Sequence, residues 1–385
     1  MIIHIRVTWV LLLLLFTLPL HVSARQDIQQ RILQVGPDRE FLYPSVAAKF
    51  ARDGDVIEID ASGNYLNDHV VWKQNDLTIR GVNGRPHIHS IGEIPNKKGI
   101  WVVQGNNVNI SNIEFSGARV ADRNGAAIRL EGKDFTLSDC YIHDNENGIL
   151  SGIKQESSVV IDNCEFAFNG QGGEGYTHNI YIGQVTNFTL KNSYSHHAIV
   201  GQLVKSRAEN NYILYNRLFE GNSSYAIDLS NGGYALVMGN IIYQGEDTEN
   251  YSLVTFGPEG YKHKRNKMEL LYNTFLNERR SAVFIKVRRG GEVDVANNLF
   301  SGNGIVVSGE ARVTNNLHES PLFKSFSPSG YQLLSRKMPL VVDKGRDLSR
   351  GGVAYPIPEY HFKSGRIEPR KLLGKAFDLG AVEIK

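Results

Sequence analysis

Short runs in which apolar and polar residues alternate recur along this chain, and an alternation with a period of two predicts strands that bury one face. We expect the following runs to be equivalent strands of a repeating unit: AIRLEG (127–132), NIYIG (179–183), QLVKSR (202–207), AIDLSN (226–231), SLVTFG (252–257), VFIKVR (283–288) and GIVVSG (304–309). The runs differ mainly in the turns between them, and the largest turn insertions are 170–178 and 256–267.

An asparagine, or a substitute for it, follows these strands at a repeated position and precedes an aromatic or apolar residue. We expect one column formed by Asn112, Asp139, Asn163, Asn192, Asn216, Asn240, Asn297 and Asn315, with Tyr272 in the gap. The step is about 24 residues from 139 to 163, from 192 to 216 and from 216 to 240. Such a period is too short for a βαβ unit and fits one coil of a solenoid whose neighbouring coils stack about 4.8 Å apart.

The predicted fold is therefore all-β, a single-stranded parallel β-helix with an Asn ladder. We expect an N-terminal strand and cap over residues 25–75, in which 43–52 is a short amphipathic helix. The β-helix itself spans 76–318, and an irregular segment, 319–385, caps the other end. Stacking places Cys140 and Cys164 in adjacent coils about 5 Å apart, which leaves both a disulfide and two buried thiols open.

The first residues predict an export signal. One positive charge precedes an apolar stretch, residues 7–20, and small residues follow up to Ala24, after which we expect cleavage. An uncleaved anchor is the alternative. The mature protein is then periplasmic or extracellular, has no membrane span and is expected to be a monomer. A formal net charge of +2 over 385 residues argues against a nucleic-acid partner.

Candidate chemistry lies on the outside of the strands. Four polar residues lie ten to twelve positions before the ladder residue of their coil: Arg129, Tyr181, Lys205 and Asp228. We therefore expect them in one outward column, in which the coil that contains residue 150 separates Arg129 from the other three. Arg207 is two residues from Lys205 and shares its face. The alternative is that Lys205 and Asp228 form a purely structural salt bridge between strands.

Polar residues near this column extend the candidate site. His178 and Tyr176 follow the glycine-rich insertion at 170–178, which we expect to lie over the face. His197 lies in the turn before the Lys205 strand, and Asn231 ends the Asp228 strand. A basic run is either a solvated edge or a strip that binds an anionic glycan, and it contains Lys262, Lys264, Arg265, Lys267, Arg279, Arg280, Lys286, Arg288 and Arg289.

The segments GYTHNIYIG (175–183) and GQLVKSRAENN (201–211) resemble the right-handed parallel β-helix superfamily of pectate lyases, over about residues 35–320. The second segment is similar to chondroitinase B-like and alginate-lyase-like enzymes and to mannuronan C5-epimerases. In the lyases an acidic residue opens the strand, a Lys near its end is the base, and Ca²⁺ neutralises the uronate. Here Gln202 stands at the acidic position and Arg207 at the Lys position, and the Asp-Pro-His-Asp motif of the epimerases is missing.

These observations predict a protein that acts on an acidic, uronic-acid-containing polysaccharide by β-elimination or C5-epimerisation. Both reactions remove the proton on C5, which needs a base, a group that neutralises the carboxylate and an acid. We expect Lys205 or Tyr181 as base, Arg207 on the carboxylate and His178 as acid or orienting group, with Asp228 beside them. The expected substrate-binding residues are Arg129, Tyr176, His197 and Asn231.

Two other functions remain open. One is a non-catalytic glycan-binding or surface protein on the same solenoid. The other is a glycoside hydrolase, which needs two carboxylates about 5–10 Å apart, and only Asp228 lies on the predicted face. No HExxH motif or phosphate-binding loop occurs, so no metal ligand is assigned and Ca²⁺, implied by the resemblance, is the only candidate cofactor.

Overall fold

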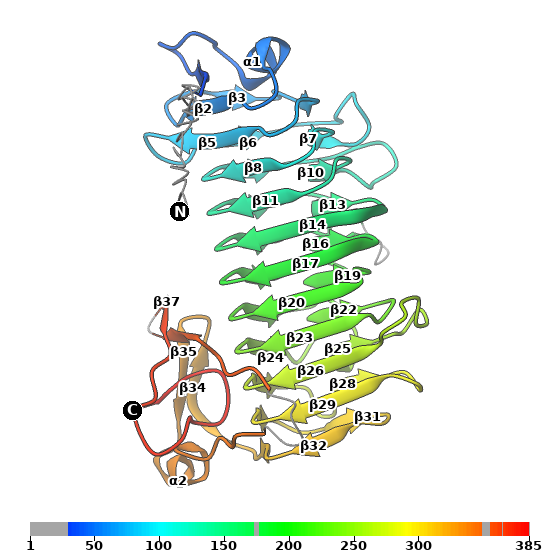
Figure 1. Cartoon of the computed structure of the whole chain (residues 1–385), viewed down its shortest axis with the longest axis vertical. Helices are drawn as coiled ribbons and strands as arrows, with labels where there is room; N and C mark the ends of the chain where they lie inside the picture. Colours follow the sequence, from blue (N-terminus) through cyan, green and yellow to red (C-terminus); the bar gives the residue numbers. More distant parts are fainter. Residues whose placement is uncertain (1–29, 173–176, 349–354, 364, 385) are drawn as a thin grey trace, which may run out of the picture. The chain divides into compact units, whose positions relative to one another are not determined.

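Parallel strands in three sheets dominate the computed structural model, which describes residues 30–172, 177–348, 355–363 and 365–384 (Figure 1). Each strand pairs in parallel with the equivalent strand of the next coil, as Figure 1 shows for the neighbouring arrows of sheet A. Sheet A contains β1 (Ile32–Val35), β2 (Val56–Asp60), β5 (Thr78–Val82), β8 (Val108–Ser111), β11 (Phe135–Ser138), β14 (Lys154–Asp162), β17 (Val185–Lys191), β20 (Asn210–Leu214), β23 (Tyr234–Met238), β26 (Lys267–Leu271), β29 (Glu292–Ala296) and β32 (Arg312–Thr314).

Sheets B and C complete each coil. Sheet B contains β3 (Tyr65–Leu66), β6 (His87–His89), β9 (Glu114–Ser116), β12 (Tyr141–His143), β15 (Glu165–Ala167), β18 (Tyr194–His196), β21 (Arg217–Glu220), β24 (Ile241–Gln244), β27 (Thr274–Asn277), β30 (Leu299–Ser301) and β33 (Leu317–His318). Sheet C contains β4 (Val70–Trp72), β7 (Gly99–Val103), β10 (Ala126–Leu130), β13 (Asn147–Ser151), β16 (Ile180–Ile182), β19 (Val204–Ser206), β22 (Ile227–Leu229), β25 (Ser252–Phe256), β28 (Val283–Val287) and β31 (Ile305–Ser308). The predicted parallel β-helix is confirmed, and the seven runs identified in the sequence are seven of the ten strands of sheet C in the described residues.

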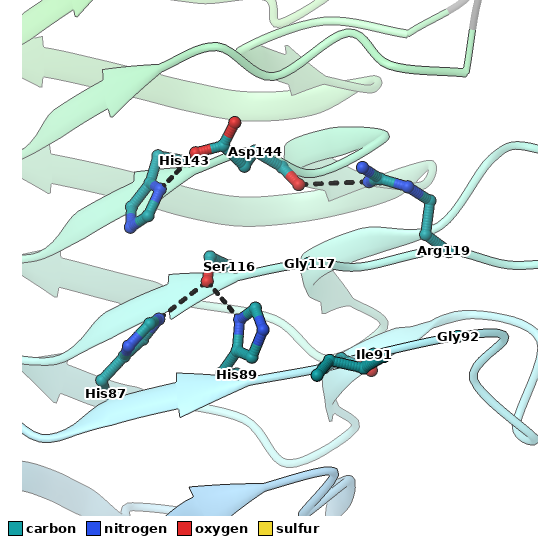
Figure 2. Close-up of a pocket in the computed structure, with 10 residues that line it drawn as sticks. His87, His89, Ile91, Gly92, Ser116, Gly117, Arg119, His143 and Asp144 are labelled. Carbon is teal, nitrogen blue, oxygen red and sulfur yellow. Dashed lines mark hydrogen bonds and ion pairs between the residues drawn. The ribbon is translucent and has the colours of Figure 1, made fainter.

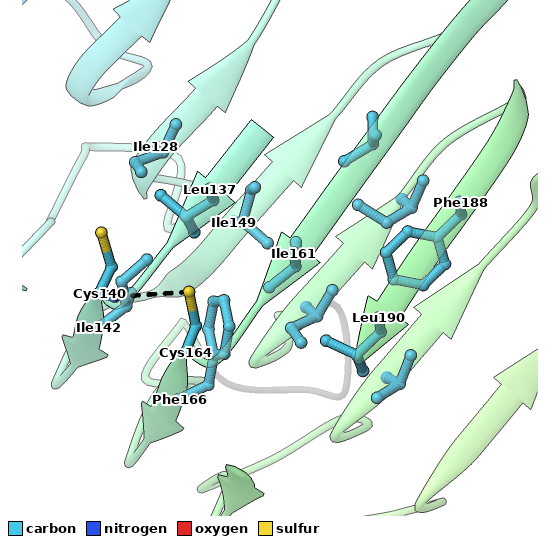
Figure 3. Packing of buried hydrophobic residues seen from close by; sticks show 14 of the residues in the cluster. Ile128, Leu137, Cys140, Ile142, Ile149, Ile161, Cys164, Phe166, Phe188 and Leu190 are labelled. Atoms are coloured by element: carbon cyan, nitrogen blue, oxygen red, sulfur yellow. Dashed lines mark hydrogen bonds between the residues drawn. The ribbon is translucent and has the colours of Figure 1, made fainter. Parts of the chain in front are cut away.

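The core is a stack of apolar side chains from all three sheets. Figure 3 shows Ile128 and Ile149 of sheet C, Leu137 of sheet A and Phe166 of sheet B on the inside of successive coils. Equivalent aromatic side chains also stack, as Phe275 and Phe300 do with ring centroids 4.8 Å apart. Because the alternate residues of each strand face inward, each buried Leu, Ile or Phe contributes about 1.5–3 kcal/mol of transfer free energy.

The Asn ladder is present, but its register differs from the prediction. Asn216 and Asn240 are buried, and the Oδ1 atom of Asn240 accepts the backbone N–H of Asn216 at 2.8 Å and its Nδ2 at 3.0 Å. The same bonds join the equivalent residues of later coils, Asn273, Asn298 and Asn316.

The other predicted ladder residues lie one position earlier, in a column of left-handed backbone conformation. Asn163 and Asn192 have φ values of 51° and 55°, and the next two coils place Tyr215 and Gly239 there. Asparagine and glycine tolerate this conformation, whereas Asn at the next position forms the buried amide ladder, so the sequence shows Asn at both neighbouring positions for two different reasons. The predicted single column of Asn163, Asn192, Asn216 and Asn240 is therefore wrong by one residue.

Cys140 and Cys164 occupy the buried ladder position of adjacent coils, so the predicted proximity is confirmed. Both are free thiols, and the Sγ atom of Cys164 lies 3.5 Å from the backbone nitrogen of Cys140 (Figure 3). Burial raises the pKa of the Cys164 thiol well above its usual range. Of the two readings that the sequence left open, the structure has the buried thiols.

The N-terminal boundary of the solenoid is earlier than predicted. Strand β1 already pairs in parallel with β2, so coiling begins at Ile32 rather than near residue 76. The predicted helix is present as α1 (Pro44–Phe50), with Pro44 at its first position and Ala47 buried. The predicted export signal, residues 1–24, lies outside the described residues. No helix in the described part of the chain is long and apolar enough to cross a membrane.

The C-terminal segment packs along the side of the last coils. It contains the antiparallel pairs β34 (Phe323–Ser327) with β35 (Gly330–Leu333) and β36 (Tyr360–Lys363) with β37 (Arg366–Pro369), and the short helices η1 (Ser335–Lys337) and α2 (Met338–Val341). Phe362 and Val382 pack against Phe219 and Ile241 of sheet B. Ile305 on the last strand of sheet C remains 55% exposed, so the expected covering of the end is incomplete.

Candidate functional site

One outward column of sheet C carries the predicted site residues. The register pairs Arg129 with Leu150, Leu150 with Tyr181, Tyr181 with Lys205, and Lys205 with Asp228. These residues therefore occupy equivalent positions of successive coils, as the sequence repeat predicted, and Leu150 lies between Arg129 and the rest. The column continues to Thr255 and Lys286.

Lys205 is held between two carboxylates. Its Nζ atom lies 3.5 Å from Oδ2 of Asp228 and 3.2 Å from Oε1 of Glu259. The side chain of Lys205 is 13% exposed and that of Asp228 only 4% exposed, so this ion pair is shielded from water. Ser230 Oγ donates a further bond to Asp228 at 2.9 Å. Burial raises the pKa of Asp228, although Lys205 opposes that shift.

Arg207 binds the Glu259 carboxylate through hydrogen bonds. The Nε and Nη2 atoms of Arg207 donate to the two carboxylate oxygens at 2.9 Å and 2.7 Å. Its guanidinium also lies 5.0 Å from the ring centroid of Tyr181, in cation–π distance. Burial by itself would raise the pKa of Glu259, but the bonds and charges of Arg207 and Lys205 outweigh it and lower that pKa.

His178 lies behind Tyr181 instead of at the edge of a groove. It is 2% exposed, and its ring stacks on the Tyr181 ring with centroids 5.6 Å apart. Its Nδ1 atom accepts the backbone N–H of Gln202 at 3.1 Å. Burial, with smaller contributions from the Lys205 and Arg207 charges, lowers the pKa of His178 to about 3. The lowered pKa favours the neutral imidazole, so of the two roles expected for His178 the buried, stacked position suits the orienting group, and the role of acid stays a prediction.

A hollow of about 480 Å³, here called the Arg207 hollow, opens beside these residues. It is lined by Ser151, Gly152, Ile153, Tyr181, Gly183, Gln184, Arg207, Asn231, Glu259 and Lys262. A second hollow of about 430 Å³, the Arg129 hollow, is lined by Gln104, Arg129, Leu130, Glu131, Gly152 and Lys154. Because Gly152 lines both, the two hollows adjoin on the outside of sheet C.

The remaining predicted residues divide between this face and other places. Asn231 lines the Arg207 hollow and Arg129 lines the adjoining one. His197 follows β18 of sheet B and is exposed, with its Nδ1 atom 2.6 Å from Nδ1 of His196, so it does not join the site. Tyr176 lies outside the described residues.

The basic run does not form one strip. Lys267 belongs to sheet A, where its Nζ atom lies 2.8 Å from Glu269. The Arg279 guanidinium donates to the backbone oxygen of Thr248 in the turn between sheets B and C. Only Lys262 lines the Arg207 hollow, so strand alternation and turns distribute these cations over different faces.

Glu259 is the main residue that the sequence reading missed. It lies in the insertion at 256–267, and a turn has no period from which the direction of a side chain can be read. His263 of the same insertion approaches the backbone oxygen of Arg207, with its Nε2 atom at 3.2 Å. The insertion therefore supplies one of the two carboxylates that contact Lys205, and Asp228 on β22 supplies the other.

Ca²⁺ does not fit this arrangement. The ion takes six to eight oxygen ligands. Here the carboxylates of Asp228 and Glu259 are bonded to Lys205 and Arg207, and a neutral Gln202 stands at the acidic position of the resembling lyases. The positive charges at this place are the side chains of Lys205 and Arg207.

A family model and one solved structure agree with this architecture. The family described as right handed beta helix region matches residues 68–198 and 153–318, so the chain belongs to the right-handed β-helix family. The crystal structure of pectate lyase Pel9A is similar with a TM-score of 0.54 and 13% identity, over 92% of this chain and 97% of that one. A structure from Geobacillus virus E2, ORF18, matches with a TM-score of 0.41 and 13% identity, over 82% of this chain and 61% of that one. No curated protein sequence matches.

Proposed function

We propose that this protein is an exported, monomeric enzyme that removes the C5 proton of a uronic-acid unit in an acidic polysaccharide. The observation that carries the proposal is the position of Glu259. Its carboxylate is held by Arg207 and Lys205 at 2.7–3.2 Å, beside a hollow that is open to solvent. The same two cations can bind the carboxylate of a uronate when the Glu259 carboxylate, on the 256–267 insertion, moves away from them.

The surroundings of this pair suit an extended anionic chain. The Arg207 and Arg129 hollows adjoin at Gly152, and cationic side chains line both, including Lys262 in one and Lys154 in the other. A polysaccharide lying along sheet C would thus meet positive charges in several successive coils. The fold similarity to a pectate lyase, a β-helix enzyme, supports the same class of substrate.

The chemistry requires a base near the bound carboxylate. When Arg207 neutralises that carboxylate, the C5 proton becomes more acidic, and Tyr181 or Lys205 accepts it. In β-elimination the C5–H electrons form a C4=C5 double bond, the C4–O bond breaks, and the leaving oxygen takes a proton. Lys205 is already committed to two carboxylates, whereas Tyr181 has the guanidinium beside its ring, which favours Tyr181 as the base.

Glycoside hydrolysis is the second candidate, and one observation favours it. Asp228 and Glu259 both contact Lys205 Nζ, so the two carboxylates lie within about 7 Å of each other, in the range that glycosidases use. Their pKa values are also shifted in opposite directions, as an acid and a base or nucleophile require. Against it stands the burial of Asp228, whose side chain is only 4% exposed.

Turnover of defined uronates tests the proposal. The purified protein is incubated with polygalacturonate, alginate and chondroitin sulfate, and the ultraviolet absorbance of the unsaturated product is followed. The expected result is a rise with one of them, lost in Tyr181→Phe and in Arg207→Ala but kept in Arg366→Ala, a control at an exposed cation on β37. New reducing ends without absorbance would establish hydrolysis instead. Binding without any product would establish a non-catalytic glycan-binding protein.

A further inference from the structure

Three successive coils of sheet B place two histidines and a glutamate on one outer face, away from the sheet C site. The register pairs His87 of β6 with Glu114 of β9, and Glu114 with Tyr141 of β12. His143 lies two residues after Tyr141 and so points to the same side of the strand. No sequence motif signals this cluster, because its members are about 27 residues apart, one from each coil.

The ligand atoms of these three residues converge. His143 Nε2 lies 3.1 Å and His87 Nε2 lies 3.7 Å from Oε1 of Glu114, and all three lie within 4.8 Å of one another. The side chains of His87, Glu114 and His143 are 41%, 27% and 16% exposed, so an ion from solvent can reach them. Two imidazole nitrogens and a carboxylate oxygen this close need movements of only about 1 Å to surround one ion with bonds of about 2.0–2.2 Å.

The neighbours of His143 orient it as such a ligand. Its Nδ1 atom lies 2.6 Å from Oδ2 of Asp144, as Figure 2 shows. When the Nδ1–H of His143 donates a hydrogen bond to Asp144, the lone pair of Nε2 faces the Glu114 carboxylate. Both groups are then electron-pair donors, and a cation bound between them would be a ligand partner for each. Carboxylates that hold the far nitrogen of a ligating histidine are the usual support of metal sites. The Asp144 backbone is in turn held by the guanidinium of Arg119 at 3.1 Å.

Space remains for further ligands. A hollow of about 440 Å³, the histidine hollow, is lined by His87, His89, Ser90, Ile91, Gly92, Ser116, Gly117, Arg119, His143 and Asp144. Ser116 Oγ lies 2.7 Å from both His87 Nε2 and His89 Nδ1, so it holds these rings toward the hollow (Figure 2). The Ser116 hydroxyl has one proton and can donate it to only one of these two nitrogens. When it donates to His89 Nδ1, the lone pair of His87 Nε2 is available to bind a metal ion.

We propose that His87, Glu114 and His143 form a binding site for a divalent transition-metal ion of the Zn²⁺ type. Imidazole nitrogens with one carboxylate suit Zn²⁺ and its neighbours in the first transition row, whereas Ca²⁺ and Mg²⁺ take oxygen ligands. Three protein ligands leave a coordination position open toward the histidine hollow. This site is independent of the proposed reaction at sheet C, because it shares no residue with it.

Zn²⁺ alone is the probe for the experiment. The full mature chain, without a histidine tag and stripped with a chelator, is titrated with Zn²⁺ by calorimetry and with Co²⁺ by visible absorption. We expect one ion per chain and the d–d bands of a low-coordinate Co²⁺ site. His143→Ala should weaken binding by more than about a hundredfold, and Asp144→Asn by about tenfold to a hundredfold, the effect of removing an orienting partner. His318→Ala, an exposed histidine on the last strand of sheet B, should change nothing.

The outcomes separate a site from general histidine binding. Absence of a bound ion in the wild-type protein, or an equal affinity in His143→Ala, would overturn the proposal. His87→Gln provides a second ligand variant whose exposed side chain carries little risk to folding, and it should also abolish the Co²⁺ bands. The unfolding midpoint of each stripped variant shows that the fold is retained, so that lost binding reports on the ligands.

Discussion

The buried ion pair between Lys205 and Asp228 makes a prediction about stability as well as activity. Replacing Lys205 by methionine retains the length of the side chain but leaves the Asp228 carboxylate, which is 4% exposed, without its cation. Removal of one partner of a buried pair is strongly destabilising because the other charge is stranded. A variant made only to test catalysis would therefore lose stability too.

The size of the effect follows from the protonation of Asp228. In the variant, the Asp228 carboxyl group takes up a proton and so avoids an unpaired buried charge. Protonating it lowers the free energy of unfolding by about 1.4 kcal/mol for each pH unit above the pKa that Asp228 has in the wild-type protein. Since the unfolded pKa is about 3.9 and the folded pKa is raised, the loss is at most about 4 kcal/mol at pH 7. At pH 5 the limit falls to about 1.5 kcal/mol, so the penalty is present at neutral pH and is lost as the pH decreases.

Denaturant unfolding at pH 7 and pH 5 measures this difference. We expect Lys205→Met to lose about 2–4 kcal/mol at pH 7 and clearly less at pH 5. The double variant Lys205→Met/Asp228→Asn removes both charges and should return to within about 1 kcal/mol of the wild-type stability. A Lys205→Met protein as stable as the wild type at pH 7, or a double variant no better than the single one, would refute the pairing.

Three further predictions concern other parts of the molecule. Asn240→Ala should lower the free energy of unfolding by about 2–4 kcal/mol in denaturant unfolding, because buried backbone groups of the ladder lose their hydrogen-bond partners. Asn163→Gly, in the exposed left-handed column, should change the free energy of unfolding by less than about 1 kcal/mol. Glu220→Gln should raise the thermal midpoint at pH 8 and leave it unchanged near pH 4, since burial raises the pKa of Glu220 and its ionised form destabilises the fold as the pH rises. Glu259→Gln should bind an anionic oligosaccharide about tenfold more tightly in a calorimetric titration, because it weakens the competing carboxylate on Arg207, and unchanged or weaker binding would show that Glu259 does not occupy the substrate position.

The repeat made most of the fold predictable from the sequence. Strand alternation identified seven of the ten strands that sheet C has in the described residues, and counting within one coil placed Tyr181, Lys205 and Asp228 at equivalent positions of successive coils. The ladder was misassigned by one residue because Asn is favoured both at the left-handed position and at the buried position that follows it.

Residues whose position depends on turns or on burial could not be read in this way. Glu259 comes from an insertion without periodicity, and the burial of His178 depends on its packing against Tyr181 and the Gln202 backbone. His87, Glu114 and His143 meet only through the register of sheet B, whose short strands have too few residues to show a pattern.

Proton exchange at C5 of a uronate is the measurement that tests the central claim most directly, because elimination and epimerisation share that step. An oligouronate is incubated with the protein in D₂O, and loss of the C5 proton signal, from intact units or through unsaturated product, is followed by NMR. We expect loss of this signal with the wild-type protein and with Arg366→Ala, and no loss with Arg207→Ala although that variant remains folded. A C5 signal that persists with the wild-type protein on every uronate tested, or equal exchange by Arg207→Ala, would contradict it.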